Sequence, residues 1–167
     1  MKFLKIFFAS LLCTITIAKA QFTTAELQVS GLTCALCSKA TEKSLKTLPF
    51  IGDIKPDLVH NVFVITFKNG QPVSFDLISK KVQDAGFFVN SLKATFNFSK
   101  VDIKDNRFIY GTDNFEIING AGKPLSGALA LTLIDKGFGS KALTKKYLAQ
   151  APTGATGAHG RVYHVVL

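Results

Sequence analysis

The sequence predicts an α+β fold in two consecutive parts, the first with a βαββαβ order of elements and the second rich in strands. Two observations predict the first part. Apolar and polar residues alternate in several short segments, and between these segments apolar residues recur every three or four positions. The third observation is a series of short strand-like segments, separated by Asp, Asn and Gly, in the second half of the chain. We therefore expect two domains, over residues 21–94 and 95–167.

The first expected domain starts with the alternating residues 25–30, which are typical of a half-buried strand. A helix that Pro49 ends is expected next, with one face formed by Cys37, Ala40, Thr41, Ser44, Leu45 and Leu48. Residues 51–57 predict a second strand. Gly52 and Pro56 favour the edge of the sheet for this strand, because both weaken strand pairing.

Residues 62–67 have the strongest strand pattern of the chain, and residues 69–70 (Asn-Gly) supply a turn after them. Ser74 is the expected N-cap of a second helix, whose inner face comprises Phe75, Ile78, Val82 and Ala85. Gly86 ends that helix, and residues 87–92 give the fourth strand. This order is the ferredoxin-like arrangement, for which we expect the strand order 4-1-3-2.

The alternating directions of these elements bring three connections to the same end of the domain: residues 31–34, 58–61 and 86–87. Two cysteines and one histidine lie on or beside these connections: Cys34, Cys37 and His60. We therefore expect any chemistry of the first domain at this end.

The second expected domain has five strand-like segments, at residues 96–98, 107–110, 115–118, 127–134 and 161–167. Ser140 is the expected cap of a single helix that extends to Ala149. These elements predict a small β-barrel or open sheet with one helix. The sequence assigns no role to this part of the chain.

Residues 1–20 have the pattern of a secretory signal peptide. Lys2 and Lys5 precede an apolar stretch, and Ala18-Lys19-Ala20 ends in a small residue that suits cleavage. The apolar stretch is about 12–15 residues long, shorter than the roughly 18 that a membrane span needs. We expect cleavage after Ala20 and a periplasmic or secreted protein. Lipid attachment at Cys13 is the alternative.

The charge balance limits the classes of partner. The chain has 20 basic and 11 acidic residues, and loss of the three lysines of residues 1–20 leaves 17 basic residues and a net charge of +6. Nucleic-acid-binding proteins gather such charges on one face, whereas here they are spread along the sequence, so we expect no nucleic-acid partner. A solvated basic surface, of a kind that anionic membranes can attract, is the simpler interpretation of this balance.

Cleavage leaves two cysteines, Cys34 and Cys37, and this spacing is found in tight disulfides, redox pairs and metal sites. Cys34 lies before the first expected helix and Cys37 in its first turn, where unpaired N–H groups and the helix dipole favour thiolates. Thiolates are soft donors that select soft metals. Two exposed sulfurs suit Cu(I) better than structural zinc, which takes four protein ligands.

Residues 31–37, Gly-Leu-Thr-Cys-Ala-Leu-Cys, resemble the Gly-Met-Thr-Cys-x-x-Cys signature of the heavy-metal-associated domain family, with Leu32 in place of Met. Residues 85–87, Ala-Gly-Phe, resemble a second motif of that family. The whole chain is similar to exported proteins of this kind from Bacteroidetes. The resemblance implies that Cys34 and Cys37 bind Cu(I), or else Zn(II), Cd(II) or Hg(II). It also implies buffering, chaperoning or transfer of the metal to a protein partner, without catalysis.

Two other functions stay open at this point: an adaptor whose β-rich part binds a partner, and a thiol-redox protein. His60 is predicted to be a polar turn residue with a possible influence on the metal, and His164 an ordinary strand residue. No combination of nucleophile, base and oxyanion site is apparent in the sequence, so we do not predict an enzyme.

Overall fold

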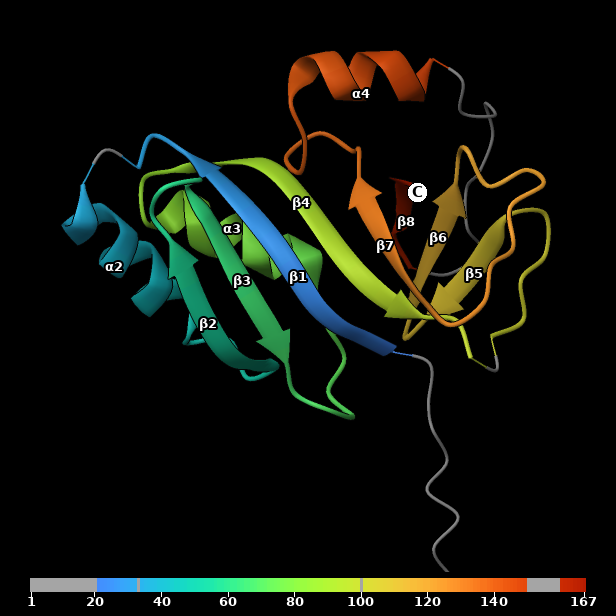
Figure 1. Cartoon of the computed structure of the whole chain (residues 1–167), viewed down its shortest axis with the longest axis horizontal. Helices are drawn as coiled ribbons and strands as arrows, with labels where there is room; N and C mark the ends of the chain where they lie inside the picture. The colour runs from blue at the N-terminus through green and yellow to red at the C-terminus, as the bar shows by residue number, and fades with distance from the viewer. Residues whose placement is uncertain (1–20, 33, 100, 150–159) are drawn as a thin grey trace, which may run out of the picture.

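The computed structural model describes residues 21–32, 34–99, 101–149 and 160–167, and the predicted signal peptide, which includes Cys13, lies outside them. Along the described chain the elements are β1 (Gln21–Ser30), α2 (Ala35–Leu45), β2 (Ile51–Asp57), β3 (Val62–Phe67), α3 (Phe75–Asp84), β4 (Phe88–Asn97), β5 (Arg107–Tyr110), β6 (Asp113–Ile117), β7 (Ala128–Leu133), α4 (Lys141–Leu148) and β8 (Val162–Val166). The strands form one eight-stranded sheet in the order β2-β3-β1-β4-β7-β8-β6-β5 (Figure 1).

The first half has the predicted βαββαβ order and the predicted strand order, with β2 at the edge of the sheet. β1 is central and runs antiparallel to both β3 and β4. Alternation turns Leu27, Ile65 and Leu92 to one face, where they are fully buried in a core shared with the helices. The sheet is thus hydrophobic on the face that the helices cover.

The inner face of α2 differs from the predicted one. Ser38, Thr41 and Leu45 are its buried residues, whereas Ala40 is exposed and Cys37 is only partly buried. The helix can bury the hydroxyl of Thr41 because Thr41 Oγ1 donates to the carbonyl oxygen of Cys37 (3.1 Å), within the same helix. The buried face of α2 is therefore rotated relative to the predicted face, which leaves Cys37 at the edge of the buried face.

The inner face of α3 is confirmed, apart from its last position. Ser74 Oγ accepts a hydrogen bond from the N–H of Leu77, as an N-cap does. Phe75, Ile78 and Val82 are fully buried, while Ala85 at the C-cap is partly exposed.

One long strand, β4, stands where two were predicted. Residues 92, 94, 96 and 98 are all buried, so the two-residue alternation continues from the first half into the second. β4 pairs with β1 on one side and with β7 on the other, which makes the sheet continuous. The predicted boundary between residues 94 and 95 falls within this strand, and the division into two domains stays a prediction.

The second half has the predicted strands and the predicted helix, but its strands extend the first half's sheet. β5 and β6 form a hairpin, β6 pairs in parallel with β8, and β7 joins β8 to β4. Ser140 Oγ caps α4 through the N–H of Leu143. None of the described helices is long and apolar enough to span a membrane.

An aromatic cluster fills the junction between the halves. Phe22 and Phe75 of the first half contact Phe115 of β6, with ring centroids 5.4 and 6.1 Å apart. Phe115 in turn stacks on Tyr163 of β8 at 5.1 Å, and all four rings are almost fully buried. Such contacts stabilise a fold beyond the area that they bury. The two halves therefore share one hydrophobic core.

Candidate metal centre

Cys34 is the N-cap of α2. Its backbone is extended (φ −149°, ψ 157°), its carbonyl oxygen accepts the N–H of Ser38, and its Sγ accepts the N–H of Cys37 at 3.3 Å. A sulfur in this position replaces the usual capping oxygen and satisfies a helix N–H that has no partner within the helix. The first turn of α2 carries no acidic residue, so no carboxylate there opposes a negative charge on the sulfur.

Cys37 is the third residue of α2, and both cysteines are free thiols with their Sγ atoms 2.6 Å apart. The hydrogen bond between the thiols, followed by the backbone N–H of Cys37, lowers the pKa of Cys34 below its ordinary value. The same hydrogen bond between the two thiols, together with partial burial, raises the pKa of Cys37. The lowered pKa of Cys34 favours this sulfur as the first of the two to become a thiolate.

The predicted meeting of three connections at one end is confirmed. The N–H of Val29, next to the end of β1, donates to the carbonyl oxygen of Asn61 in the β2–β3 turn. Phe87, after α3, packs within 3.5 Å of the place where a Cβ on Gly31 would lie. A small cavity of about 160 Å³ opens between these segments, lined by Leu32, Cys34, Ala35, Ser38, Leu58 and Asn61. Leu32 is partly buried and also packs against the core.

His60 lies in the β2–β3 turn at this end, but its ring is bound to Asp57. His60 Nδ1 is 2.8 Å from Asp57 Oδ2, and Asp57 Oδ1 accepts the backbone N–H groups of Val59 and His60. These hydrogen bonds from His60 lower the pKa of the Asp57 carboxyl. Asp57 was not among the residues predicted for this site, although an Asp three residues before a His in a turn is a local signal for this contact.

No group of three or more His, Cys, Asp or Glu side chains that could hold a metal ion occurs in the described part of the chain. Among these residues, the two thiols at the start of α2 are the soft donors that lie together. They are also accessible, because Cys34 is exposed and Cys37 partly so. Chemically this pair suits an ion that accepts two sulfur ligands and leaves by exchange with incoming thiolates.

Four exposed apolar side chains belong to the segments that meet at this end, and the sequence did not predict their exposure. Leu36, between the cysteines, is 79% exposed, and Phe88, at the start of β4, is 69% exposed. Leu58 and Val59 of the β2–β3 turn are 56% and 84% exposed. The exposure of Phe88 excludes packing of this side chain in the core. We call these four residues the apolar tip.

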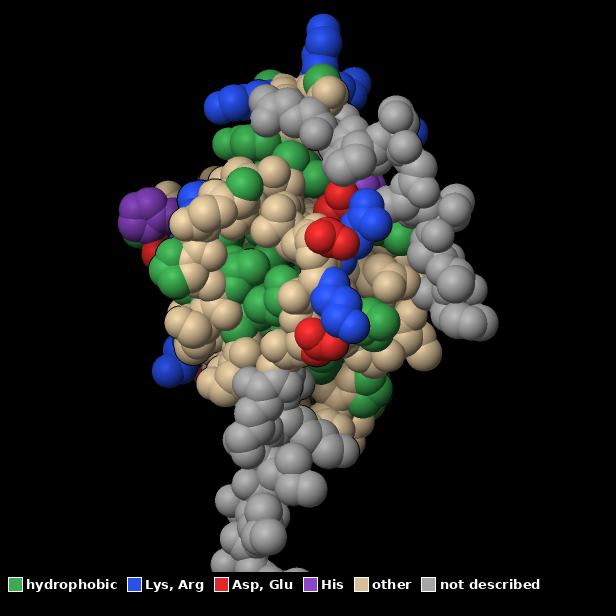
Figure 2. Space-filling view, turned by 90° about the vertical axis from the view of Figure 1, so that its right-hand side faces the viewer, with side chains coloured by type: hydrophobic (Ala, Val, Ile, Leu, Met, Phe, Trp, Pro, Cys, Tyr) green, Lys and Arg blue, Asp and Glu red, His purple; other side chains and the backbone are tan. Residues whose placement is uncertain are grey.

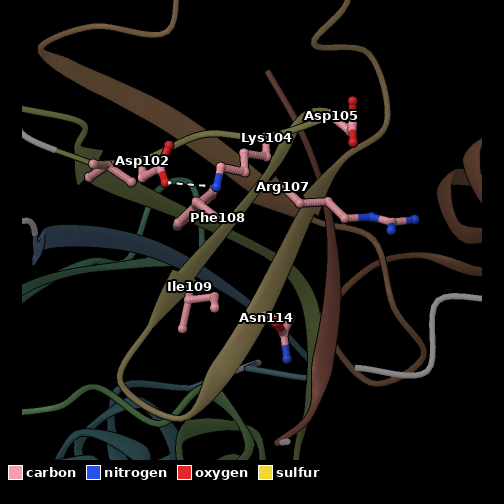
Figure 3. A pocket seen from close by; sticks show the side chains of 8 residues that line it. Asp102, Lys104, Asp105, Arg107, Phe108, Ile109 and Asn114 are labelled. Atoms are coloured by element: carbon pink, nitrogen blue, oxygen red, sulfur yellow. Dashed lines mark ion pairs between the residues drawn. The ribbon is translucent and has the colours of Figure 1, made fainter. Parts of the chain in front are cut away.

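The second half carries a separate cavity of about 570 Å³ beside β5 (Figure 3). Asp102 and Lys104 pair across it at 3.5 Å, whereas Arg107 points away from them and binds Glu116 on β6 at 3.2 Å. The end of the molecule that holds this cavity has acidic and basic side chains next to one another (Figure 2). A role of this half in binding a partner stays a prediction.

His164 is a strand residue, as predicted, and it has a specific partner. Its ring Nδ1 and its backbone N–H each bind Asp135, both at 2.7 Å. This contact holds Asp135, two residues after the end of β7, against β8. In the sheet, β4 and β7 separate β8 from β1, which leads into the β1–α2 connection. His164 is therefore not part of the cysteine site.

Comparison with known proteins gives a match to the heavy-metal-associated domain over residues 26–88. Copper-transporting ATPase 1 of Rhizobium meliloti is 34% identical over 70 residues, which are 42% of this chain and 8% of the ATPase. Two solved structures are similar to the same part. The yeast copper transporter domain Ccc2a is 28% identical, with 40% of this chain and 90% of that domain covered and a TM-score of 0.36. Apo-CopP from Helicobacter pylori is 29% identical, with 40% and 97% covered and a TM-score of 0.35.

The match to the heavy-metal-associated domain includes both cysteines and runs from within β1 to the first residue of β4. It does not include the second half, whose strand β7 pairs with β4. The part of the chain that matches the heavy-metal-associated domain is thus residues 26–88, the part that holds the cysteine pair.

Proposed function

We propose that this protein binds one soft metal ion, Cu(I) in the first place, through Cys34 and Cys37, and buffers it or passes it to a protein partner. The observation that carries the proposal is the contact between two free, accessible sulfurs at the start of α2. The hydrogen bonds that favour a thiolate on Cys34 support it, because the thiolate is the form that binds metals.

The number of donors favours Cu(I) over Zn(II). A structural zinc site normally has four protein ligands, and the described residues offer no cluster of three around these sulfurs. Zn(II), Cd(II) and Hg(II) remain soft or borderline ions that two thiolates can bind with additional ligands from solvent or a partner. The name of the 34% identical relative, a copper-transporting ATPase, supports the same preference.

We propose further that the protein acts in the periplasm or outside the cell, after removal of residues 1–20. The charged start, short apolar stretch and Ala-Lys-Ala end of that segment support this location. An accessible two-sulfur site fits a carrier there, since a partner thiolate can approach the ion from the open side.

Metal titration of the anaerobically reduced protein tests the proposal. We expect one Cu(I) per chain in competition with a Cu(I) chelator, and none in the Cys34→Ser/Cys37→Ser variant, which should keep its fold because both side chains lie at the surface. Mg(II) is the control ion, because a hard cation has no preference for sulfur. Equal Cu(I) uptake by the parent and the double variant would refute the assignment.

A thiol-redox function is the second candidate, and one observation favours it. The lowered pKa of Cys34 beside the raised pKa of Cys37 is the asymmetry that a disulfide-exchange pair uses. Two results together would favour this candidate over metal binding. The Cys37→Ser variant would form a mixed disulfide with added oxidised glutathione, and the parent protein would take up no Cu(I).

A further inference from the structure

The apolar tip gathers most of the large apolar side chains that the described residues expose. Seven such side chains are exposed, and four of them belong to the tip: Leu36, Leu58, Val59 and Phe88. The other three, Val64, Leu77 and Ile109, lie singly on β3, α3 and β5. Single exposed apolar residues are normal on a protein surface, but a group of them marks a contact site.

The tip residues come from three separate connections that the sheet holds together. Phe88 is paired with Ser30 at the end of β1, and Ser30 Oγ donates to its carbonyl oxygen at 3.2 Å. The β2–β3 turn is bound to β1 through Val29 and Asn61. These segments and the start of α2 lie at the upper left of Figure 1, at one end of the longest axis. The apolar side chains therefore occupy an end of the molecule.

Basic side chains without a partner lie beside the tip. Lys39 and Lys43 follow Leu36 by three and seven positions, so they lie along one side of α2, and neither has an ion-pair partner among the described residues. The acidic residues nearby are paired: Glu42 with Lys46, Asp84 with Lys80, and Asp57 with His60. The uncompensated charge beside the tip is thus positive.

We propose that the apolar tip docks this protein on an anionic lipid surface, with Leu36, Leu58, Val59 and Phe88 entering the interface. Lys39 and Lys43 then lie at the level of the headgroups, where each basic residue adds to the attraction. Protein interfaces are depleted in Lys, whereas two lysines without an ion-pair partner lie on the same helix as Leu36. This docking would bring Cys34 and Cys37 to the membrane surface, but it does not depend on their binding a metal.

Vesicle co-sedimentation of the metal-free, reduced protein tests the proposal. The chain used starts at Gln21, so that apolar residues 1–20 do not contribute, and every described helix and strand is retained. We expect binding to vesicles of phosphatidylglycerol and phosphatidylcholine in equal parts, with weaker binding to phosphatidylcholine alone. The Val59→Ser/Phe88→Ser variant should bind at least tenfold more weakly. A Lys39→Gln/Lys43→Gln variant should lose the preference for the anionic vesicles.

Ile109→Ser is the matched control, because Ile109 is 67% exposed on β5, away from the tip. Thermal unfolding checks that each variant is folded. Failure of the parent to bind, or an equal loss in the Ile109 variant, would overturn the proposal. It would also be overturned if the tip substitutions abolished self-association or binding to another protein but left vesicle binding unchanged. Cu(I) uptake is measured in parallel. If the parent protein takes up no Cu(I) but binds the vesicles, the proposed metal function is contradicted and the proposed docking is not.

Discussion

The hydroxyl of Tyr163 donates a hydrogen bond to Oδ2 of Asp76 over 3.1 Å and so ties the last strand of the chain to the first turn of α3. Arg161 binds Oδ1 of the same carboxylate, and its guanidinium lies 4.8 Å from the centre of the Tyr163 ring. Asp76 belongs to the half that matches a known domain, and the other two residues belong to the half that does not. One carboxylate therefore joins the two halves.

We expect Tyr163 to make the stability of the protein sensitive to alkaline pH. Burial, followed by the negative charge of Asp76, raises the pKa of Tyr163 above its ordinary value of 10. A group with a raised folded-state pKa stabilises the fold below its unfolded pKa, and this contribution is lost as the pH rises beyond that value. Tyr163→Phe should therefore lose less stability than the parent between about pH 9 and 11, measured by urea unfolding. Tyr147→Phe is the control, and an equal loss in all three proteins would contradict the expectation.

The shared core predicts that both halves unfold together. Phe96 is fully buried in β4 and its ring lies 4.7 Å from that of Phe22 and 4.6 Å from that of Phe108. Phe96→Ala should lower the free energy of unfolding by about 3–5 kcal/mol. Hydrogen exchange in β3 and β8 should increase in parallel, since one core supports both strands. Ile109→Ala should change stability by less than about 0.5 kcal/mol. Faster exchange in β8 alone would indicate two separate folding units.

The two thiols should react at different rates. Because its pKa is lowered, Cys34 carries more thiolate at neutral pH than Cys37, whose pKa is raised. Iodoacetamide in limiting amount should therefore alkylate Cys34 first, and peptide mass spectrometry identifies the modified residue. Bound Cu(I) should protect both sulfurs. Preferential modification of Cys37 would show that the order is reversed.

His60→Ala should change Cu(I) and Zn(II) affinity by less than tenfold, or about 1.4 kcal/mol, between pH 5.5 and 8. The reason is that the His60 ring is bound to Asp57. We expect His60 to tune metal transfer or its pH response rather than to hold the ion, and transfer to an apo acceptor at several pH values measures this. Loss of more than tenfold in affinity would make His60 a ligand.

The stability of the β2–β3 turn, which holds His60, should also depend on pH in the acid range. His60 lowers the pKa of Asp57, so the carboxylate stabilises the turn above its unfolded pKa and stops doing so as the pH falls through the folded value. His60→Ala should reduce this loss of stability at acid pH. Amide exchange of Val59 and His60, whose N–H groups bind Asp57, reports the change locally.

We expect export to remove residues 1–20. Intact mass measurement of the protein from the cell envelope should give a chain that starts at Gln21, which is the first residue of β1. A lipid adduct on Cys13 would instead indicate a membrane-anchored protein.

Several features followed from the sequence because they depend on neighbours along the chain. Alternation in residues 62–67 and the three–four spacing after Ser74 gave β3 and α3, since each pattern matches the period of one element. The weak strand with Gly52 and Pro56 did take the edge of the sheet. The position of Cys34 before a helix and Cys37 in its first turn was also a local matter, decided by where α2 begins.

Other features depended on contacts between residues far apart in the sequence. The residues near Thr95 in the sequence do not predict that β4 pairs with β7. Neither does the local sequence predict that Phe115 stacks on Tyr163, because packing between distant parts of the chain determines which strands are neighbours. The apolar tip likewise arises only when β1 brings Leu36, Val59 and Phe88 to one end. The sequence by itself thus determined the elements and the pair of sulfurs, whereas the tertiary structure decided what surrounds them, since burial and exposure are properties of the packed chain.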